Sequence, residues 1–280
     1  MRKEVVKYAF VIVLTALTSL TTINLKAQLT PNVPSGDEAM FENPRSFLWM
    51  GNYGTFRITD QFFVTGEFHY RRTQHEGTRY IGRLAQVYNR WGIQWNPNKK
   101  FNATLGGVLR LDFTPEPGND DLSSLILEPR IWHQYMFARP FSRFMVYHRL
   151  RFEHRWSTRH VPGSEWIYRT RYRYMFLMKI PINNTKLEPG TFYGYPNIEI
   201  IMQSGSDVVN SPLEDLRLFP ALGYIYNPRI SFSAGMMYTF GQRFPIGDLY
   251  RTRWVARFNV YISLDFRKFE EKIPEIGIMD

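Results

Sequence analysis

A long, uniform alternation of apolar and polar side chains constrains the fold of this chain more than any other feature. From Ser46 to Phe266, runs of about 10 to 16 residues alternate at period two, with turn-forming residues between them. Successive side chains of a β-strand point to opposite faces, so each run indicates a strand with one apolar and one polar face. No stretch combines helical periodicity with helix caps. The sequence therefore predicts an all-β fold.

The run 251–266 shows the two faces most clearly. Its apolar face carries Thr252, Trp254, Ala256, Phe258, Val260, Ile262, Leu264 and Phe266, and its other face carries Arg251, Arg253, Arg257, Asn259, Ser263 and Asp265. The runs 101–113, 143–155 and 165–180 repeat this division. The run 79–95 is ambiguous in phase, so its faces are not assigned.

The connections between the runs alternate in length. The short ones are 59–61, 96–100, 139–140 and 227–229, and the longer, more polar ones are 114–122, 157–164, 205–213 and 243–250. Short turns at one end and longer loops at the other are typical of outer-membrane barrels. Residues 181–190 are the exception, because they form a long connection where a short turn is expected.

Aromatic residues, which make up 16% of the chain, favour a membrane barrel over a soluble β-protein. They are abundant on the apolar faces, and they gather near run ends at Trp91, Trp95, Trp156, Trp166, Tyr224 and Tyr226. Two such aromatic girdles flank the apolar band of transmembrane barrels. A soluble β-sandwich or periplasmic barrel is the alternative, but its strands are usually shorter and its core richer in Val, Leu and Ile. We therefore predict an antiparallel transmembrane β-barrel of the outer-membrane type.

The same runs predict the number of strands. Eleven runs are counted from Ser46 onward. Single-chain bacterial barrels normally have an even number, so we expect about 10 to 12 strands, with twelve preferred. A twelfth strand would be hidden in residues 28–45 or in a wrongly divided run.

The N-terminus has the order of a secretory signal peptide. Arg2, Lys3 and Lys7 precede an apolar run from Tyr8 to Leu20, and Ala27 is a small residue at which cleavage is expected. A retained signal anchor is the alternative, but the apolar run is short for a membrane-spanning helix. We expect a cleaved signal peptide at 1–27, an irregular lead-in at 28–45, the barrel at 46–266 and a periplasmic tail at 267–280.

The charge of the chain bears on its partners. Loss of the signal peptide would remove four basic residues and one acidic residue, which lowers the net charge from +10 to +7. A basic exported protein is suited to lipid A phosphates or anionic solutes, whereas nucleic acid is disfavoured because no helical basic cluster is present. The chain has no cysteine, so neither disulfides nor acylation of a cysteine is expected. The expected partners are outer-membrane lipid, lipopolysaccharide, the barrel-insertion machinery and anionic solutes.

Several segments resemble a known family. They are Phe47-Leu48-Trp49-Met50, Glu67-Phe68-His69-Tyr70-Arg71-Arg72, Tyr168-Arg169-Thr170-Arg171-Tyr172-Arg173-Tyr174, Leu218-Phe219-Pro220-Ala221-Leu222-Gly223-Tyr224 and Phe232-Ser233-Ala234-Gly235-Met236-Met237-Tyr238. In this pattern the chain from Ser46 to Phe266 resembles an uncharacterised family of bacterial outer-membrane proteins, domain of unknown function 2490. The resemblance implies an outer-membrane barrel and supplies no activity and no functional residues. The chain departs from most such barrels because the aromatic residue that ends its last run, Phe266, is not terminal.

The strongest local feature is a ladder of arginines on two neighbouring runs. It consists of Arg149, Arg151, Arg155, Arg169, Arg171 and Arg173. Arginine that faces lipid at the membrane midplane costs roughly 2–4 kcal/mol, so this face is expected to line the lumen. The ladder could form a binding path for phosphate or carboxylate anions. The favoured alternative is a plug of ion pairs with the carboxylates of the same parity, Glu67, Asp112, Glu128, Glu153, Glu199, Asp215 and Asp265.

Catalytic and metal-binding patterns are weak. His148 and His154 are at positions of their run that are expected to face lipid, and no serine is near them on that strand. A hydrolase needs a serine within hydrogen-bond reach of a histidine, so a membrane-embedded lipid-modifying enzyme is only the further alternative. With His160 these histidines are spaced by about 20 Å along a strand, too far to share one metal ion. Glu116, Asp120 and Asp121 fit a solvated loop better than a Ca²⁺ site. We assign no catalytic residue, metal or cofactor, and expect a structural barrel or a narrow channel.

Overall fold

The computed structural model describes residues 40–113, 125–208, 211–242 and 249–267, and these residues are all-β. The short β1 (Met40–Phe41) precedes eleven long strands. These are β2 (Arg45–Arg57), β3 (Phe62–His75), β4 (Thr78–Asn98), β5 (Phe101–Asp112), β6 (Ile126–Pro140), β7 (Met145–Ser157), β8 (Ile167–Pro181), β9 (Phe192–Ser204), β10 (Leu213–Asn227), β11 (Ile230–Gln242) and β12 (Leu249–Asp265). Among the described residues, no helix is long and apolar enough to cross a membrane. The predicted signal peptide, and the tail from residue 268 onward, lie outside them.

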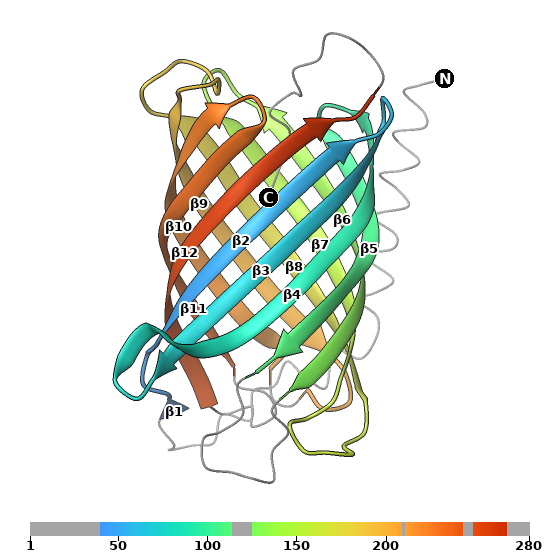
Figure 1. The fold of residues 1–280 in the computed structure, drawn as a ribbon, viewed down its shortest axis with the longest axis vertical. Coiled ribbons are helices and arrows are strands. Elements are labelled where there is room, and N and C mark those ends of the chain that lie inside the picture. Colours follow the sequence, from blue (N-terminus) through green and yellow to red (C-terminus); the bar gives the residue numbers. More distant parts are fainter. Residues whose placement is uncertain (1–39, 114–124, 209–210, 243–248, 268–280) are drawn as a thin grey trace. The chain divides into compact units, whose positions relative to one another are not determined.

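The long strands form one closed barrel in which strands that follow one another in the chain lie side by side (Figure 1). These neighbouring pairs are antiparallel, whereas the closing pair of β2 and β12 is parallel. An odd number of antiparallel strands leaves the first and last strands pointing the same way, so the barrel must close through a parallel pair. The all-β barrel with about 10 to 12 strands is therefore confirmed: eleven long strands close the barrel, and the short β1, which lies in the segment 28–45, is the twelfth strand of the sheet. The short β1 also pairs with β12 in the parallel sense and extends this seam.

The barrel wall separates the two faces that the alternation predicts. All long strands except β7 carry an exposed large apolar side chain, and Leu105 and Trp91 are 61% and 62% exposed. Side chains of the opposite parity lie inside, where Arg151 is 3% exposed. The polar faces of the strands therefore lie inside the barrel. Because charged side chains are almost never fully buried in soluble proteins unless they are paired, these inward-facing charges need partners.

A register shift explains why the apolar and polar faces of the run 79–95 could not be assigned from its sequence. In the pairing of β3 with β4, Arg71 lies opposite Gln86 and Arg72 lies opposite Leu84, which leaves Ala85 as an extra residue. An extra residue in one strand reverses the side-chain alternation on either side of it. The apolar residues of β4 therefore change parity partway along the strand.

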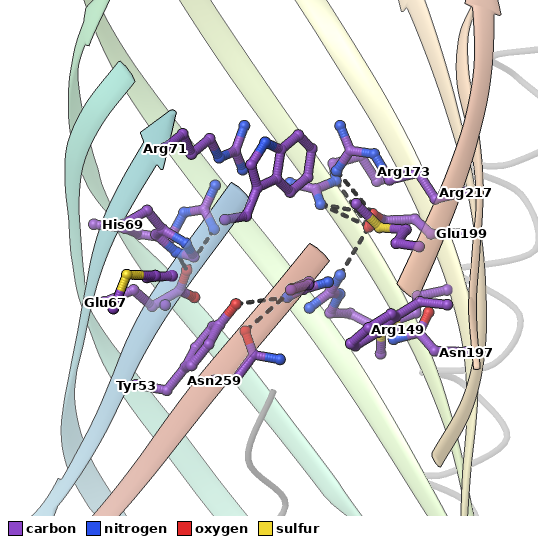
Figure 2. A pocket seen from close by; sticks show the side chains of 18 of the residues that line it. Tyr53, Glu67, His69, Arg71, Arg149, Arg173, Asn197, Glu199, Arg217 and Asn259 are labelled. Atoms are coloured by element: carbon purple, nitrogen blue, oxygen red, sulfur yellow. Dashed lines mark hydrogen bonds and ion pairs between the residues drawn. The ribbon is translucent and has the colours of Figure 1, made fainter. Parts of the chain in front are cut away.

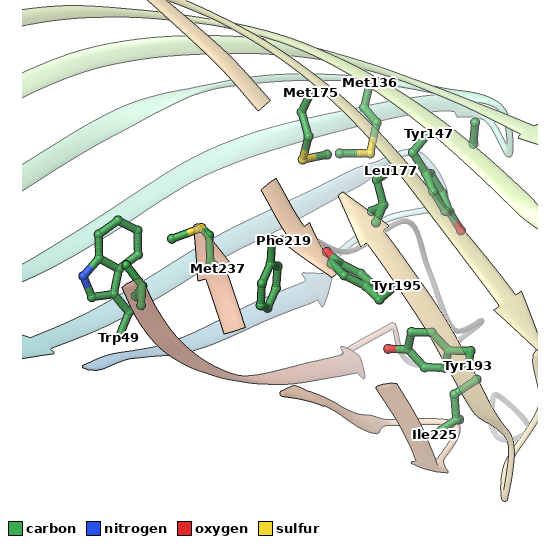
Figure 3. Close-up of a cluster of buried hydrophobic side chains, with 12 residues drawn as sticks. Trp49, Met136, Tyr147, Met175, Leu177, Tyr193, Tyr195, Phe219, Ile225 and Met237 are labelled. Carbon is green, nitrogen blue, oxygen red and sulfur yellow. The ribbon is translucent and has the colours of Figure 1, made fainter. Parts of the chain in front are cut away.

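An apolar cluster fills part of the barrel interior (Figure 3). The long connection between β8 and β9 contributes to it, because Leu187 packs against the cluster. Backbone hydrogen bonds link this connection to β10: the Gly190 amide donates to the Ile225 carbonyl at 2.7 Å, and the Ile225 amide donates to the Thr191 carbonyl at 3.0 Å. The extra length of this connection thus supports packing inside the barrel.

Candidate functional site

A dense group of charged side chains in the barrel interior is centred on Glu153 of β7. Its carboxylate is 0% exposed. It forms ion pairs with Arg90, Arg130, Arg171 and Arg173 at 2.8, 2.8, 3.1 and 2.8 Å, respectively. These arginines belong to β4, β6 and β8, so the ion pairs converge from several strands. A buried carboxylate needs a compensating charge, and this one is surrounded by four.

Each of these four arginines also reaches a second glutamate. The additional pairs are Arg90 with Glu67 at 2.7 Å, Arg130 with Glu128 at 2.5 Å, Arg173 with Glu199 at 2.7 Å, and Arg171 with Glu214. The four arginines therefore connect five glutamates in one structure, which we call the Glu153 network. Its outer glutamates lie on β3, β6, β9 and β10, so the network joins strands on different sides of the barrel.

The predicted arginine ladder lies on adjacent strands, as expected. Across the pairing of β7 with β8, Arg151 lies opposite Arg173, Arg155 opposite Arg169, and Glu153 opposite Arg171. Like charges directly opposite each other destabilise a strand pair. Glutamates from other strands offset this repulsion: Glu67 accepts from Arg151 at 3.4 Å, and Glu214 pairs with Arg155 at 3.2 Å.

The two remaining ladder residues have different surroundings. Arg149 forms an ion pair with Glu199 of β9 at 2.8 Å. Arg169, nearer the loop that joins β7 to β8, donates to the Ser157 hydroxyl at 3.2 Å. The structure therefore brings five of the six predicted arginines to carboxylates named above, and it places Arg169 toward the end of the strand pair.

The carboxylates that were expected to pair with arginines behave as predicted with one exception. The pairs inside the barrel involve Glu67, Asp112, Glu128, Glu153, Glu199 and Asp215. Asp265 instead pairs with Arg267, just beyond the end of β12, at 2.5 Å. The sequence pattern missed Glu214, because the register of β10 shifts between Leu213 and Asp215 and changes the alternation there.

A cavity, which we call the chamber, lies beside the Glu153 network (Figure 2). Its wall includes seven arginines, Glu67 and Glu199, together with the rings of Trp49 and Tyr53. The space open to the centre of a water molecule is about 40 Å³. A polar cavity of this size has room for ordered water or a small ion. A second cavity against Trp132 measures about 30 Å³.

Two arginines of the chamber are held by neutral side chains. Arg71 donates to Gln86 at 3.1 Å and to the Tyr88 hydroxyl at 2.5 Å, and its guanidinium lies 3.6 Å from the ring centre of Trp49. Arg257 donates to the Tyr53 hydroxyl at 2.7 Å. The sequence places both residues on polar faces, but it does not reveal these cross-strand partners.

The outward-facing histidines contact hydroxyl groups on β8. His148 Nδ1 lies 2.8 Å from the Tyr174 hydroxyl, and His154 Nδ1 lies 2.8 Å from the Tyr168 hydroxyl. His154 is also 3.4 Å from Oγ1 of Thr170. A hydrolytic triad requires a nucleophile activated by a histidine that a third group orients. In the described strands, the hydroxyl groups that His148 and His154 contact are those of Tyr174, Tyr168 and Thr170.

Within the residues that the structure describes, no group of three or more His, Asp or Glu side chains could hold a metal ion. The acidic loop residues considered for Ca²⁺, Glu116, Asp120 and Asp121, lie outside these residues.

Comparison with known proteins identifies a family. The model of the family described as Protein of unknown function (DUF2490) matches residues 47–267. The match spans the long strands of the barrel, which run from Arg45 to Asp265. No curated protein and no solved structure matches the chain. Because the matched region covers most of its 280 residues, the chain belongs to the DUF2490 family of proteins of unknown function, as its sequence resemblance predicts.

Proposed function

We propose that this protein is an outer-membrane β-barrel whose interior is closed to free diffusion of solutes. Support for the membrane part comes from the outside of the barrel, where Leu105, Trp91 and Phe258 are 61%, 62% and 52% exposed. Exposure of this kind is costly in water and favourable in lipid. Lipid and lipopolysaccharide are the partners that fit such a surface, and a signal peptide would export the chain to the compartment in which the insertion machinery acts.

The Glu153 network is the observation that supports a barrel interior closed to solutes. It links five buried or nearly buried glutamates through four arginines that come from different sides of the barrel. Ion pairs of this density hold their side chains in place, because an arginine or glutamate that leaves the network abandons a buried opposite charge. The barrel would then act through its outer surface and loops, and its interior would provide rigidity.

Two measurements test this proposal. Outer-membrane fractions run on gels with and without boiling report whether a folded barrel is present, and planar-bilayer recordings report conductance. We expect a mobility shift in the outer-membrane fraction and no steady conductance. Recovery in the soluble periplasmic fraction with no shift would contradict the membrane assignment. Large, stable channels formed by the wild type would contradict the closed interior.

An anion-preferring narrow channel is the second candidate. It is favoured by the surplus of arginines over carboxylates around the chamber. If the wild type conducts, the Arg151→Ala and Arg171→Ala variants are expected to lower its preference for anions, since both guanidinium groups lie inside the barrel. Arg159→Ala is the matched control, because the Arg159 side chain is 59% exposed. Unchanged ion selectivity in the interior variants would exclude this candidate.

A lipid-modifying enzyme is the further alternative, and we propose no catalytic role for the outward-facing histidines. The test is hydrolysis of phospholipid vesicles by the wild type and by His148→Ala. Hydrolysis that the substitution abolishes would support an enzyme, and an inactive wild type would remove this alternative.

A further inference from the structure

We propose that the chamber beside the Glu153 network binds one small oxyanion of the phosphate class. The chamber lies in the barrel interior, and its lining residues come from β2 to β4 and from β7 to β12 (Figure 2). The proposal concerns the interior alone and goes beyond the proposed function, because it does not depend on whether the barrel conducts.

The first argument is the balance of charge. Seven arginines line the chamber, but the only carboxylates among its described lining residues are Glu67 and Glu199. Glu153 lies behind the wall and already pairs with two of these arginines, Arg90 and Arg173. Asp215, also behind the wall, pairs with a third, Arg217. Even when Glu153 and Asp215 are both included, positive charges exceed negative charges by three. Buried charges without compensation are strongly destabilising, so an anion in the chamber would stabilise the folded barrel.

The second argument is the environment of Arg71 and Arg257. Among the described residues, the contacts of Arg71 are Gln86, Tyr88 and the ring of Trp49, all of them neutral. The contacts of Arg257 are Tyr53, Asn259 and the Phe219 ring, which lies 4.9 Å from its guanidinium carbon. These contacts hold each guanidinium in position and leave its charge uncompensated.

The geometry suits an oxyanion better than a halide. Guanidinium groups present several N–H donors in one plane, and this arrangement matches the oxygen atoms of phosphate. Stacking on Trp49 and bonding to Tyr88 fix the guanidinium of Arg71 before any ligand binds, so little conformational entropy is lost on binding. A chamber of about 40 Å³ lined by guanidinium groups suits a small inorganic anion such as phosphate.

The test uses the full chain, folded in detergent, with inorganic phosphate as the probe. Its unfolding midpoint is measured as phosphate is titrated, and sodium chloride at matched ionic strength is the comparison. A ligand that binds only the folded state raises the midpoint with the logarithm of its concentration. We expect phosphate to raise the midpoint and chloride to leave it nearly unchanged. Equal effects of the two salts would overturn the proposal.

Two variants locate the site. In Arg71→Gln with Arg257→Gln, we expect phosphate affinity to fall by about tenfold or more for each arginine that contributes a charged hydrogen bond. Arg159→Gln, which removes an exposed arginine from a loop, is expected to keep the phosphate response. A double variant that folds and responds to phosphate like the wild type would place the anion elsewhere and overturn the assignment. If the double variant does not fold, the comparison of phosphate with chloride on the wild type decides the proposal.

Discussion

At the scale of single residues, Glu153 concentrates more charge contacts than any other carboxylate described above. Its four arginine partners each have a second glutamate, so no arginine of the network depends on Glu153 alone. Loss of Glu153 would nevertheless remove one of the two carboxylates that each of these arginines contacts, and would leave four guanidinium groups around a neutral centre. Ion pairs inside proteins are costly to break from one side, since the remaining partner stays buried and uncompensated.

The Glu153→Gln variant tests this argument, because it removes the charge and keeps the size of the side chain. We expect the free energy of unfolding to fall by roughly 3–5 kcal/mol, as is typical when one partner of a buried ion pair is lost. The measurement is the urea dependence of barrel unfolding in detergent. Glu165→Gln is the control, since Glu165 lies exposed in a loop and is expected to leave the unfolding curve unchanged. Equal stability of the two variants would mean that Glu153 does not hold the network together.

At the scale of the strand, the parallel seam between β2 and β12 is the feature that sets this barrel apart from even-numbered ones. It extends over the full length of β2, from the Arg45–Arg253 pair to the Arg57–Asp265 pair. Parallel pairs are slightly less stable per residue than antiparallel ones. The pairing of β1 with β12 adds two further parallel positions, Met40 with Leu249 and Phe41 with Tyr250.

A disulfide can test the seam, because the chain has no cysteine of its own. Met50 and Phe258 are paired across β2 and β12, and both are exposed on the outside of the barrel. Neighbouring strands are about 4.8 Å apart, within the range that a disulfide spans. We expect Met50→Cys with Phe258→Cys to cross-link on oxidation, so that the boiled protein migrates faster without reductant than with it.

The matched control combines Met50→Cys with Leu222→Cys. Leu222 is exposed to a similar extent but lies on β10, which two other strands separate from β2. No cross-link is expected in this pair. Efficient cross-linking of the control, or none in the seam pair, would contradict the parallel closure.

At the scale of the whole molecule, the barrel is apolar outside and charged inside. A charged residue placed on its outer face distinguishes lipid from water as the surroundings. In lipid, arginine at the midplane is destabilising by roughly 2–4 kcal/mol, whereas on a surface in water the change is near zero. Leu105 suits this test because it is 61% exposed and lies near the middle of β5.

We expect Leu105→Arg to reduce the amount of folded barrel in outer-membrane fractions and to lower its stability in lipid vesicles by that range. Ile182→Arg is the control, because Ile182 is 59% exposed in the connection after β8, outside the strands. If both variants insert and unfold like the wild type, the outer face is surrounded by water and the membrane proposal fails.

Local pattern was sufficient to predict much of the fold. The alternation identified the strands, the two faces of β12 and β5, and the burial of Arg151 and Arg171 on the polar face. It succeeded because the side-chain period of a strand depends only on its own backbone. It failed where the register shifts, at Ala85 and at Glu214, since a single extra residue reverses the parity without a signal in composition.

What the sequence by itself determined about this protein is thus its strands, their apolar and polar faces, and its family. The tertiary structure alone decided the parallel closure, the convergence of Arg90 and Arg130 on Glu153, and the chamber that encloses Arg71 and Arg257. The physical reason is distance along the chain. Arg90 and Glu153 are 63 residues apart, and Arg257 and Tyr53 are 204 residues apart. Such contacts depend on strand number, register and closure, which no local pattern of side chains contains.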